Sequence, residues 1–295
     1  MAKIVVFGAG GRLGAALARQ YAADHEVLAV GRGQADLAQP QMVADIVMAS
    51  APDVIINCAA MTNVDICETE RDLALRVNAE AAGVIAKAAD RCGARLIHIS
   101  TDYVFSGEQE EPYAEDAATE PVSWYGETKL RGEHAVQGEG NNHAVIRVSW
   151  VFGPDRDSFV DKALQASLRG EPVKAVADKW ASPSYTLDLA EAFRPFLTPE
   201  TPGGIYHACN AGVCTWRDWA QEAIDAAVAQ GLNPKTTTAE PLRLADIKAM
   251  VARRPVYSAM SCRRIEALLG RALPPWRDAV WAYVQDRYTA GSVRW

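Results

Sequence analysis

Tyr125 and Lys129 stand four residues apart in the run Trp-Tyr-Gly-Glu-Thr-Lys. On a helix, residues at i and i+4 share a face, so the phenol and the ammonium are expected to lie one above the other. A neighbouring cation favours the phenolate and is expected to lower the pKa of Tyr125, which would make it a proton donor near neutral pH. A solvated helix face also produces this spacing, so its meaning depends on the rest of the chain.

A glycine-rich turn opens the chain. Gly8, Gly11 and Gly14 follow an apolar run that predicts a strand and precede a segment that predicts a helix. Glycines at such a turn let the backbone approach a pyrophosphate, and the helix N-terminus supplies N–H donors and a favourable dipole. The context therefore predicts a dinucleotide site, to which we also assign Leu13, rather than a structural turn.

The end of the second predicted strand indicates which dinucleotide binds. A carboxylate there would bind the ribose 2′-hydroxyl of NAD, whereas a cation favours the 2′-phosphate of NADP. The residue at this position is Arg32, in Val-Gly-Arg. The sequence therefore predicts NADPH, with a solvated arginine as the alternative. Asp36 and Leu37 are expected to flank the adenine, although Asp36 also suits the start of a helix.

The first half of the chain alternates short apolar runs with Ala-rich, helix-like segments. The expected strands are residues 4–8, 27–30, 54–58, 95–100 and 144–148. This alternation predicts the α/β class, with a Rossmann-type doubly wound parallel sheet, helices on both faces and strands buried on both sides.

The second half is less regular. Helices are expected at 159–169, at 215–230 and from 274 to about 288, and a strand at 203–208. Thr215 and Asp218 form a plausible capping box. Tryptophan is absent before Trp124 and then occurs eight times, a compositional shift between the halves. We therefore expect an NADP-binding Rossmann domain at 1–150 and a smaller α/β, mainly substrate-binding domain at 151–295, with some later segments returning to the Rossmann sheet.

Composition excludes several classes of function. The 295 residues are 49% hydrophobic and 23% charged, as in an ordinary globular enzyme. A formal charge of -7 argues against non-specific binding to nucleic acid or anionic membranes. A strand-like run begins at Lys3, and no apolar run approaches membrane-spanning length, so we expect a cytoplasmic protein.

The cysteines and histidines carry no evident chemistry. The six cysteines show no zinc-site spacing and no disulfide framework, so reduced thiols are expected. His98 and His207 lie inside apolar runs and are expected to be hydrogen-bonded core residues without a catalytic role.

Taken together, the motifs resemble the extended short-chain dehydrogenases/reductases and, among them, the dTDP-4-dehydrorhamnose reductases. The resemblance covers nearly the whole chain, and its most discriminating strings are Ser-Thr-Asp-Tyr-Val-Phe at 100–105 and Asn-Cys-Ala-Ala-x-Thr-x-Val-Asp at 57–65. The other matching segments are the glycine turn, Asn78, Tyr125-Gly-Glu-Thr-Lys129, Arg147-Val-Ser-Trp150, Asp178-x4-Pro183, Asp188-Leu-Ala190 and Arg254-Pro-x-x-Ser258.

The resemblance implies NADPH-dependent reduction of the C4 keto group of a nucleotide-linked 4-keto-6-deoxy sugar, with dTDP-4-dehydro-L-rhamnose as the first substrate to expect. Tyr125 would donate the proton, Lys129 would lower its pKa and hold the nicotinamide ribose, and Thr101 would hydrogen-bond the carbonyl. Some enzymes that the chain resembles accept both dinucleotides, so NADH is a second candidate.

Further roles follow from the same resemblance. Cys58, Ala59, Ala60 and Thr62 would line the cofactor site. Asn78 would help place a proton-relay water with Lys129, or would be structural. The substrate-binding residues would be Thr101, Asp102, Tyr103, Trp150 and Arg254. Trp150 would lie along the deoxysugar or be a core aromatic, and Arg254 would approach the diphosphate or be a surface charge.

Three departures from the family pattern weaken the substrate assignment. Arg12 replaces a glutamine in the glycine turn and is expected to contact the cofactor phosphates. Ser158 replaces an asparagine that offers an amide to the substrate. The run from Asp178 places Lys179 and Trp180 where the sugar nucleotide is expected. A different 4-keto sugar or a different nucleotide therefore stays open.

Other functions share this fold. A regulatory subunit of methionine adenosyltransferase binds NADP without a demonstrated need for turnover, but the complete set of Thr101, Tyr125 and Lys129 favours an enzyme. A sugar-nucleotide epimerase would retain its cofactor through the cycle. Dehydratases normally carry Asp-Glu after the active-site threonine, and Asp102-Tyr103 argues against dehydration. Some relatives are described as Mg²⁺-dependent dimers, and a homodimer is possible here, but no carboxylate cluster in the sequence compels a metal.

Overall fold

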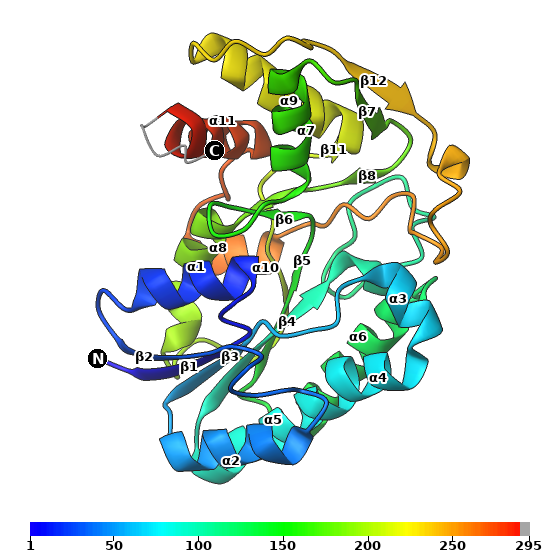
Figure 1. Cartoon of the computed structure of the whole chain (residues 1–295). Helices are drawn as coiled ribbons and strands as arrows, with labels where there is room; N and C mark the ends of the chain where they lie inside the picture. Colours follow the sequence, from blue (N-terminus) through cyan, green and yellow to red (C-terminus); the bar gives the residue numbers. More distant parts are fainter. Residues whose placement is uncertain (290–295) are drawn as a thin grey trace.

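A six-stranded parallel sheet forms the centre of the molecule (Figure 1). The computed structural model describes residues 1–289. In spatial order the strands are β10 (Gly204–His207), β5 (Ala144–Val148), β4 (Arg95–Thr101), β3 (Val54–Asn57), β1 (Lys3–Phe7) and β2 (Glu26–Val30). The chain winds to β2 on one side of β1 and to β3 on the other, which confirms the doubly wound α/β fold and places the topological switch point between β1 and β3.

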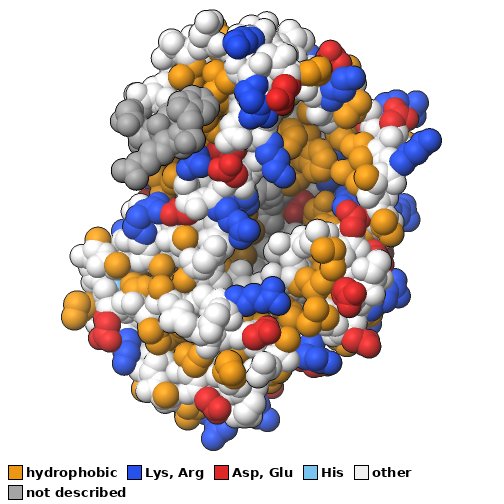
Figure 2. Space-filling model, viewed as in Figure 1, with side chains coloured by type: hydrophobic (Ala, Val, Ile, Leu, Met, Phe, Trp, Pro, Cys, Tyr) orange, Lys and Arg blue, Asp and Glu red, His pale blue; other side chains and the backbone are white. Residues whose placement is uncertain are grey.

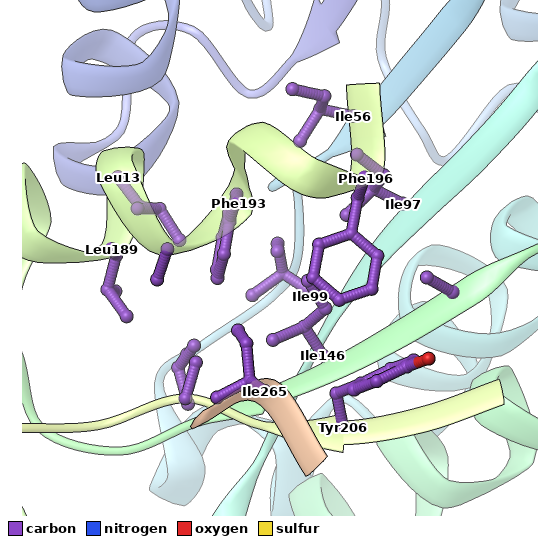
Figure 3. Packing of buried hydrophobic residues seen from close by; sticks show 14 of the residues in the cluster. Leu13, Ile56, Ile97, Ile99, Ile146, Leu189, Phe193, Phe196, Tyr206 and Ile265 are labelled. Atoms are coloured by element: carbon purple, nitrogen blue, oxygen red, sulfur yellow. The ribbon is translucent and has the colours of Figure 1, made fainter. Parts of the chain in front are cut away.

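Side chains of the central strands alternate between two hydrophobic cores. Ile4 and Val6 of β1 pack in the core beneath α1 (Arg12–Tyr21) and α8 (Thr186–Phe193), which Figure 3 shows from close by. Val5 and Phe7 pack in the opposite core, against α2 (Pro40–Ser50) and α5 (Ala81–Cys92). Burial on both faces is why these strands are continuous apolar runs in the sequence.

The strand β2 departs from this rule. It lies at the edge of the sheet and pairs with β1 alone. Its Leu28 side chain is 38% exposed, so the expectation that every strand is buried on both sides is wrong here. At the edge of the sheet, fewer helices cover the strand.

Four short elements and one long helix complete the first half. They are α3 (Val64–Thr69), α4 (Arg71–Leu75), the π-helical turn η1 (Arg76–Glu80), the 3₁₀ turn η2 (Asp102–Val104) and α6 (Trp124–Glu139). The helix α6 confirms the prediction that Tyr125 and Lys129 share a helix.

A second lobe lies over the carboxyl edge of the sheet (Figure 1). It contains α7 (Phe159–Arg169), α9 (Trp216–Ala229), α11 (Trp276–Val284) and η5 (Gln285–Thr289), with the strand pairs β7 (Val173–Val176) and β12 (Ala239–Leu242), β8 (Trp180–Ala181) and β11 (Cys214–Thr215), and β6 (Val151–Phe152) and β9 (Ser184–Tyr185). The remaining elements are η3 (Arg194–Leu197), η4 (Leu244–Asp246) and α10 (Arg263–Leu269).

Several predicted elements of the second half are present. The helices α7 and α9 lie where they are expected, and the capping box of Thr215 and Asp218 is formed in both directions. The strand β10 lies in the main sheet beside β5 although it follows residue 150. The division of the chain at residue 150 stays a prediction, and residues 290–295 of its second part lie outside the described residues.

The cysteines are all free, as expected, and four of them are buried. His98 and His207 are buried and hydrogen-bonded, as predicted. Within residues 1–289, no helix combines the length and the apolar character needed to cross a membrane.

Candidate active site

A cleft of about 1170 Å³ separates the carboxyl edge of the sheet from the second lobe. Figure 2 shows it as a hollow between the two parts of the molecule, with Lys and Arg side chains at its rim. All the predicted site residues except Asn78 and Arg254 line it: Gly8, Gly11, Arg12, Leu13, Gly14, Arg32, Asp36, Leu37, Cys58, Ala59, Ala60, Thr62, Thr101, Asp102, Tyr103, Tyr125, Lys129 and Trp150. They come from segments at the carboxyl ends of β1 to β5, where doubly wound sheets bind ligands.

The glycine turn brings the N-terminus of α1 to this cleft. A Cβ atom on Gly14 would overlap the Gly8 carbonyl, so only glycine lets the helix start this close to β1. Gly11 is the N-cap and supplies no side-chain hydrogen bond to the first turn. The N–H groups of that turn therefore remain available to an acceptor in the cleft.

Arg12 points to the second lobe. Its Nε donates to the Arg156 carbonyl at 2.9 Å, one terminal nitrogen donates to the Val151 carbonyl at 3.1 Å, and the other donates to the Asp157 carbonyl. Burial lowers the pKa of its guanidinium. The side chain thus fixes the loop after β6 to the start of α1, while its predicted contact with phosphate stays a prediction.

Arg32 lies exposed at the rim of the cleft, beyond the end of β2. It has no hydrogen-bond or ion-pair partner among residues 1–289. Asp36 accepts a hydrogen bond from the Ala38 N–H at 3.0 Å, so it stabilises the turn before α2, and Leu37 beside it is buried.

Tyr125 is held in the first turn of α6. Ser123 caps the helix by accepting a hydrogen bond from the Gly126 N–H at 3.2 Å. A Cβ atom on Gly126 would overlap the Tyr103 carbonyl, so glycine lets α6 approach η2 and brings Tyr125 beside Thr101. The Tyr103 and Tyr125 rings meet edge to face at 5.4 Å.

The pKa of Tyr125 shifts in the direction opposite to the one expected from sequence. Burial raises the pKa of this phenol, while a hydrogen bond with Thr101 lowers it by a smaller amount. Lys129 does not oppose this rise, because its Nζ donates to the Ile99 carbonyl at 2.7 Å and lies 3.3 Å from His98 Nε2. The expected lowering is therefore wrong for this arrangement: the four-residue spacing places both groups on one face of α6, but the amine extends to β4.

A buried carboxylate adjoins Thr101. The Thr101 hydroxyl donates to Asp102 Oδ1 at 3.1 Å, and Ser258 Oγ donates to Asp102 Oδ2 at 2.6 Å. Burial raises the pKa of Asp102, and the nearby Lys179 opposes that rise. Lys179 is itself buried, which lowers its pKa to about 8.

Lys179 lies behind the Tyr103 and Trp150 rings, which line the cleft. Its Nζ donates to the Pro255 carbonyl at 2.7 Å and lies over the Tyr103 and Trp150 rings at 5.4 and 5.6 Å from their centroids. The neighbouring Trp180 is 36% exposed. The departure from the family pattern at this run thus adds a cation directly behind the site.

Asn78 lies in η1, outside the cleft lining. Its Oδ1 accepts from the Met61 N–H at 2.8 Å, and its Nδ2 donates to the Met61 carbonyl and to Thr128 Oγ1, both at 3.1 Å. These contacts are the structural alternative for Asn78, because they fix the loop after β3 to α6. The water-placing role stays a prediction.

Trp150 packs against the core of the second lobe, which agrees with its structural alternative, while its contact with the deoxysugar stays a prediction. It lines the cleft, and it also stacks on Trp219 with ring centroids 5.6 Å apart. Its backbone φ is 43°, a left-handed conformation that is rare for a bulky residue and often marks a functional site. Its Nε1 is buried and has no hydrogen-bond partner among the described residues.

Several residues of the second lobe line the cleft although the sequence did not single them out. They are Arg156, Asp157, Phe159, Lys162, Trp216 and Trp219. Trp216 and Trp219 belong to the first turn of α9, directly after the capping residue Thr215. Two tryptophans three residues apart, directly after a predicted helix cap, were the sequence signal that could have identified Trp216 and Trp219.

Arg254 is bound to Asp65. Its two terminal nitrogens donate to the two carboxylate oxygens at 2.7 and 2.6 Å, and the backbone N–H groups of Val251 and Ala252 also donate to Asp65 Oδ1. The Arg254 side chain is 8% exposed. This contact ties the 251–258 segment to α3, and the diphosphate role of Arg254 stays a prediction.

No group of three or more His, Cys, Asp or Glu side chains within residues 1–289 is arranged to hold a metal ion.

Comparisons with known proteins agree with this geometry. A dTDP-4-dehydrorhamnose reductase of Burkholderia thailandensis is 36% identical over 301 residues, covering 96% of this chain and 98% of that protein. A probable dTDP-4,6-dihydroxy-2-methyloxan-3-one 4-ketoreductase of Streptomyces antibioticus is 37% identical over 282 residues, covering 94% of this chain and 92% of that protein.

Among solved structures, a dTDP-4-dehydrorhamnose reductase from Bacillus anthracis in complex with NADP has a TM-score of 0.88 to this chain at 30% identity, covering 97% of this chain and 99% of the other. The family model described as RmlD substrate binding domain matches residues 2–289. The chain therefore belongs to the RmlD substrate-binding domain family, which confirms the resemblance found in its motifs.

Proposed function

We propose that this chain catalyses the NADPH-dependent reduction of the C4 keto group of a nucleotide-linked 4-keto-6-deoxy sugar, with dTDP-4-dehydro-L-rhamnose as the substrate. The observation that carries the proposal is the convergence of Thr101, Tyr125 and Lys129 on one cleft that also contains the N-terminus of α1. The reductases reported above support the same reaction.

The residues around the cleft fit a dinucleotide. The N–H groups at the start of α1, which no side chain caps, suit a pyrophosphate. The space beside Gly10 is open, because a Cβ atom added there would meet no atom within 4 Å, so a ligand can approach the backbone of the turn. Arg32, at the end of β2, would pair with a 2′-phosphate. When bound, NADPH supplies the hydride that reduces the carbonyl carbon.

The chain's own groups would manage the oxygen of that carbonyl. Charge develops on this oxygen during reduction and needs a donor. The Thr101 hydroxyl, which donates to Asp102 in the structure, would turn to donate to this oxygen, and the Tyr125 phenol would transfer its proton to it. Because burial raises the pKa of Tyr125, the phenol stays protonated until the reaction proceeds. A Lys129 ammonium brought close to the phenol would lower that pKa and so favour transfer of the proton.

The second lobe would hold the sugar nucleotide. Trp150 offers an apolar face, and Trp216 and Phe159 add aromatic surface to the same wall. Arg156 and Lys162 supply positive charge that suits a diphosphate. We further propose that the enzyme works in the cytoplasm and that it forms a homodimer. Sedimentation of the purified protein would test the homodimer.

The test is the consumption of NADPH, followed at the nicotinamide absorbance, against dTDP-, UDP-, GDP- and CDP-linked 4-keto-6-deoxy sugars. Stoichiometric oxidation of NADPH with dTDP-4-dehydro-L-rhamnose is expected. If only another keto sugar is turned over, the proposed substrate is wrong, but the assignment of the chain as a reductase stands.

Two other outcomes would refute reduction itself. Interconversion of sugars without net loss of NADPH would indicate an epimerase. Tight NADPH binding with no turnover of any sugar would indicate a regulatory dinucleotide-binding protein.

A further inference from the structure

A buried chain of hydrogen-bonding groups connects Lys129 to the backbone of the cleft. Lys129 Nζ lies 3.3 Å from His98 Nε2, and His98 Nδ1 lies 3.2 Å from Asn57 Nδ2. The other amide atom, Asn57 Oδ1, accepts from the Ala59 N–H at 3.2 Å. Asn57, His98 and Lys129 are each no more than 2% exposed, so these groups meet their hydrogen-bonding needs mainly through one another.

The donors and acceptors in this chain can be assigned from the Ala59 end. A backbone N–H only donates, so the Asn57 oxygen must face it and the Asn57 NH₂ must face His98. The NH₂ group is a donor, so His98 Nδ1 must accept. A neutral imidazole that accepts at Nδ1 carries its proton on Nε2, and that proton points to Lys129.

His98 stays neutral in this setting. Burial lowers its pKa well below the ordinary value. An imidazolium would in addition place an N–H on Nδ1 against the Asn57 NH₂, two donors 3.2 Å apart.

An ammonium has three donors and no acceptor, so it cannot receive the His98 Nε2–H. A neutral amine can receive it and still donate to the Ile99 carbonyl, where the distance is 2.7 Å. We propose that His98 is a positioning residue which, as the Nε2–H tautomer fixed by Asn57, holds Lys129 as a neutral amine.

The charged groups around Lys129 do not overturn this arrangement. Burial lowers the pKa of Lys129 to about 8, and Glu133 of α6 opposes that change. Glu133 is neutralised by a bidentate pair with Arg147 at 2.9 and 2.7 Å and accepts from Ser100 Oγ at 2.5 Å. Burial raises the pKa of Cys58 to about 12, so this thiol carries no charge near neutral pH.

The arrangement gives Lys129 a defined change of state. Catalysis as proposed needs an ammonium near Tyr125, so Lys129 must take up a proton from solvent and turn its Nζ from the Ile99 carbonyl toward Tyr125 when an anionic ligand enters. Ala59, whose N–H fixes the Asn57 amide, lines the same cleft. This inference rests on the proposed function only for the importance of Lys129; the tautomer and the amine exist without turnover.

The first experiment is long-range ¹⁵N–¹H spectroscopy of histidine-labelled protein without NADPH, with His98→Gln used to assign the His98 signals. The Nε2–H tautomer is expected at neutral pH. An Nδ1–H tautomer or an imidazolium would overturn the proposal.

The second experiment titrates Lys129 through its ¹³Cε shift, assigned with Lys129→Met. Burial alone lowers this pKa to about 8, which would still leave an ammonium at neutral pH. We therefore expect the His98 Nε2–H to lower the pKa of Lys129 further, below neutral pH, and a measured pKa of about 8 or higher would overturn the proposal. Asn57→Asp replaces the NH₂ with an acceptor, so the proton should move to Nδ1, Nε2 should accept from the ammonium, and the Lys129 pKa should rise by about one unit or more.

Controls separate this switch from the added charge. Asn141→Asp places the same charge at an exposed site and should leave Lys129 unchanged. In a His98→Leu background, Asn57→Asp acts through space alone, so its effect on Lys129 should be smaller than in the presence of His98. An equal effect in both backgrounds would overturn the proposal, and if the variants do not fold, the tautomer of the natural protein still decides it.

A turnover measurement links the switch to function. In Asn57→Asp, the limb of the pH profile of kcat/KM that follows Lys129 should move in the same direction as the titrated pKa. Because both spectroscopic readouts need no substrate, an inactive protein with the Nε2–H tautomer would refute the proposed function alone, whereas an active protein with the Nδ1–H tautomer would refute this inference alone.

Discussion

At the scale of single residues, the proposed reduction depends on the Tyr125 hydroxyl as the proton donor. Tyr125→Phe removes only the hydroxyl, so the fold and NADPH binding should be retained while kcat falls by about 10²–10⁴-fold. Steady-state kinetics and a fluorescence titration with NADPH measure the two effects. Tyr257→Phe, which changes a tyrosine outside the cleft lining, serves as the matched control and should leave kcat unchanged. Natural turnover in Tyr125→Phe would exclude this residue as the acid.

The proposed role of Arg32 is to favour NADPH over NADH. Arg32→Asp should weaken NADPH binding by about 10-fold or more, because the guanidinium pairs with the 2′-phosphate and the new carboxylate repels it. The exposed position keeps the effect modest and sensitive to salt. NADH binding should be unchanged or improved. Arg91→Asp alters the net charge equally at an exposed site outside the cleft and should change neither affinity.

Residue spacing predicted which groups meet in the cleft but not their protonation. Tyr125 and Lys129 were identified because residues at i and i+4 share a helix face. The direction of the Tyr125 pKa shift was missed, because it depends on burial beneath η2 and on the carbonyl of Ile99, which local spacing cannot reveal. His98 was correctly predicted as a core residue. Its contact with Lys129 was not predicted, because it depends on how α6 packs against β4.

At the scale of elements, α9 carries Trp216 and Trp219 into the cleft, and its N-terminus is fixed by a capping box. Thr215 accepts from the Asp218 N–H at 3.1 Å, and Asp218 accepts from the Thr215 N–H at 3.0 Å. Thr215→Ala should lower the free energy of unfolding by about 1 kcal/mol. Thr215→Ser retains the hydroxyl and should restore most of the loss in denaturant unfolding. Equal stability of the Ala and Ser variants would show that the cap contributes nothing.

The 251–258 segment depends on Asp65. Asp65→Asn should lower the free energy of unfolding by roughly 1–3 kcal/mol, because it breaks a paired hydrogen bond to Arg254 whose side chain is 8% exposed. Arg254 holds the pKa of Asp65 below its ordinary value, so this contribution is present above the unfolded pKa of about 3.9 and is lost as the pH falls further.

Denaturant unfolding across pH measures this effect. The difference between the natural protein and Asp65→Asn should be constant near neutral pH and shrink below about pH 4. A difference that does not depend on pH would show that the ion pair is not its cause. Asp116→Asn, at an exposed aspartate that forms no ion pair within residues 1–289, is the control and should show no such change.

Elements were predicted best where burial is simple. The strands of the main sheet and the helices α6, α7 and α9 follow from apolar runs, periodicity and caps. The two-residue strands of the second lobe, such as β6 and β9, are too short to leave a pattern. The π-helical turn η1 also escaped prediction, because its extra residue is stabilised by the contacts of Asn78 rather than by helix propensity.

At the scale of the whole molecule, the cleft requires two lobes held at a fixed separation. Arg254 and Asp65 connect them on one side, and Arg12 connects α1 to the loop after β6 on the other. Arg19 adds an ion pair from α1 to Asp155 in the same loop. The sequence predicted two segments but not these connections, because each joins residues more than a hundred positions apart.

Arg12 therefore has two competing roles that one substitution separates. In Arg12→Gln the shorter amide cannot donate to the carbonyls of Val151, Arg156 and Asp157 together. If the link between the lobes is its main role, the free energy of unfolding should fall by roughly 1–2 kcal/mol without NADPH present. If Arg12 instead contacts the cofactor phosphates, NADPH affinity should fall while the stability of the protein alone is unchanged. We expect the loss of stability, measured by denaturant unfolding, with Arg91→Gln as the control at an exposed site. Unaltered unfolding together with weakened NADPH binding would assign Arg12 to the phosphates.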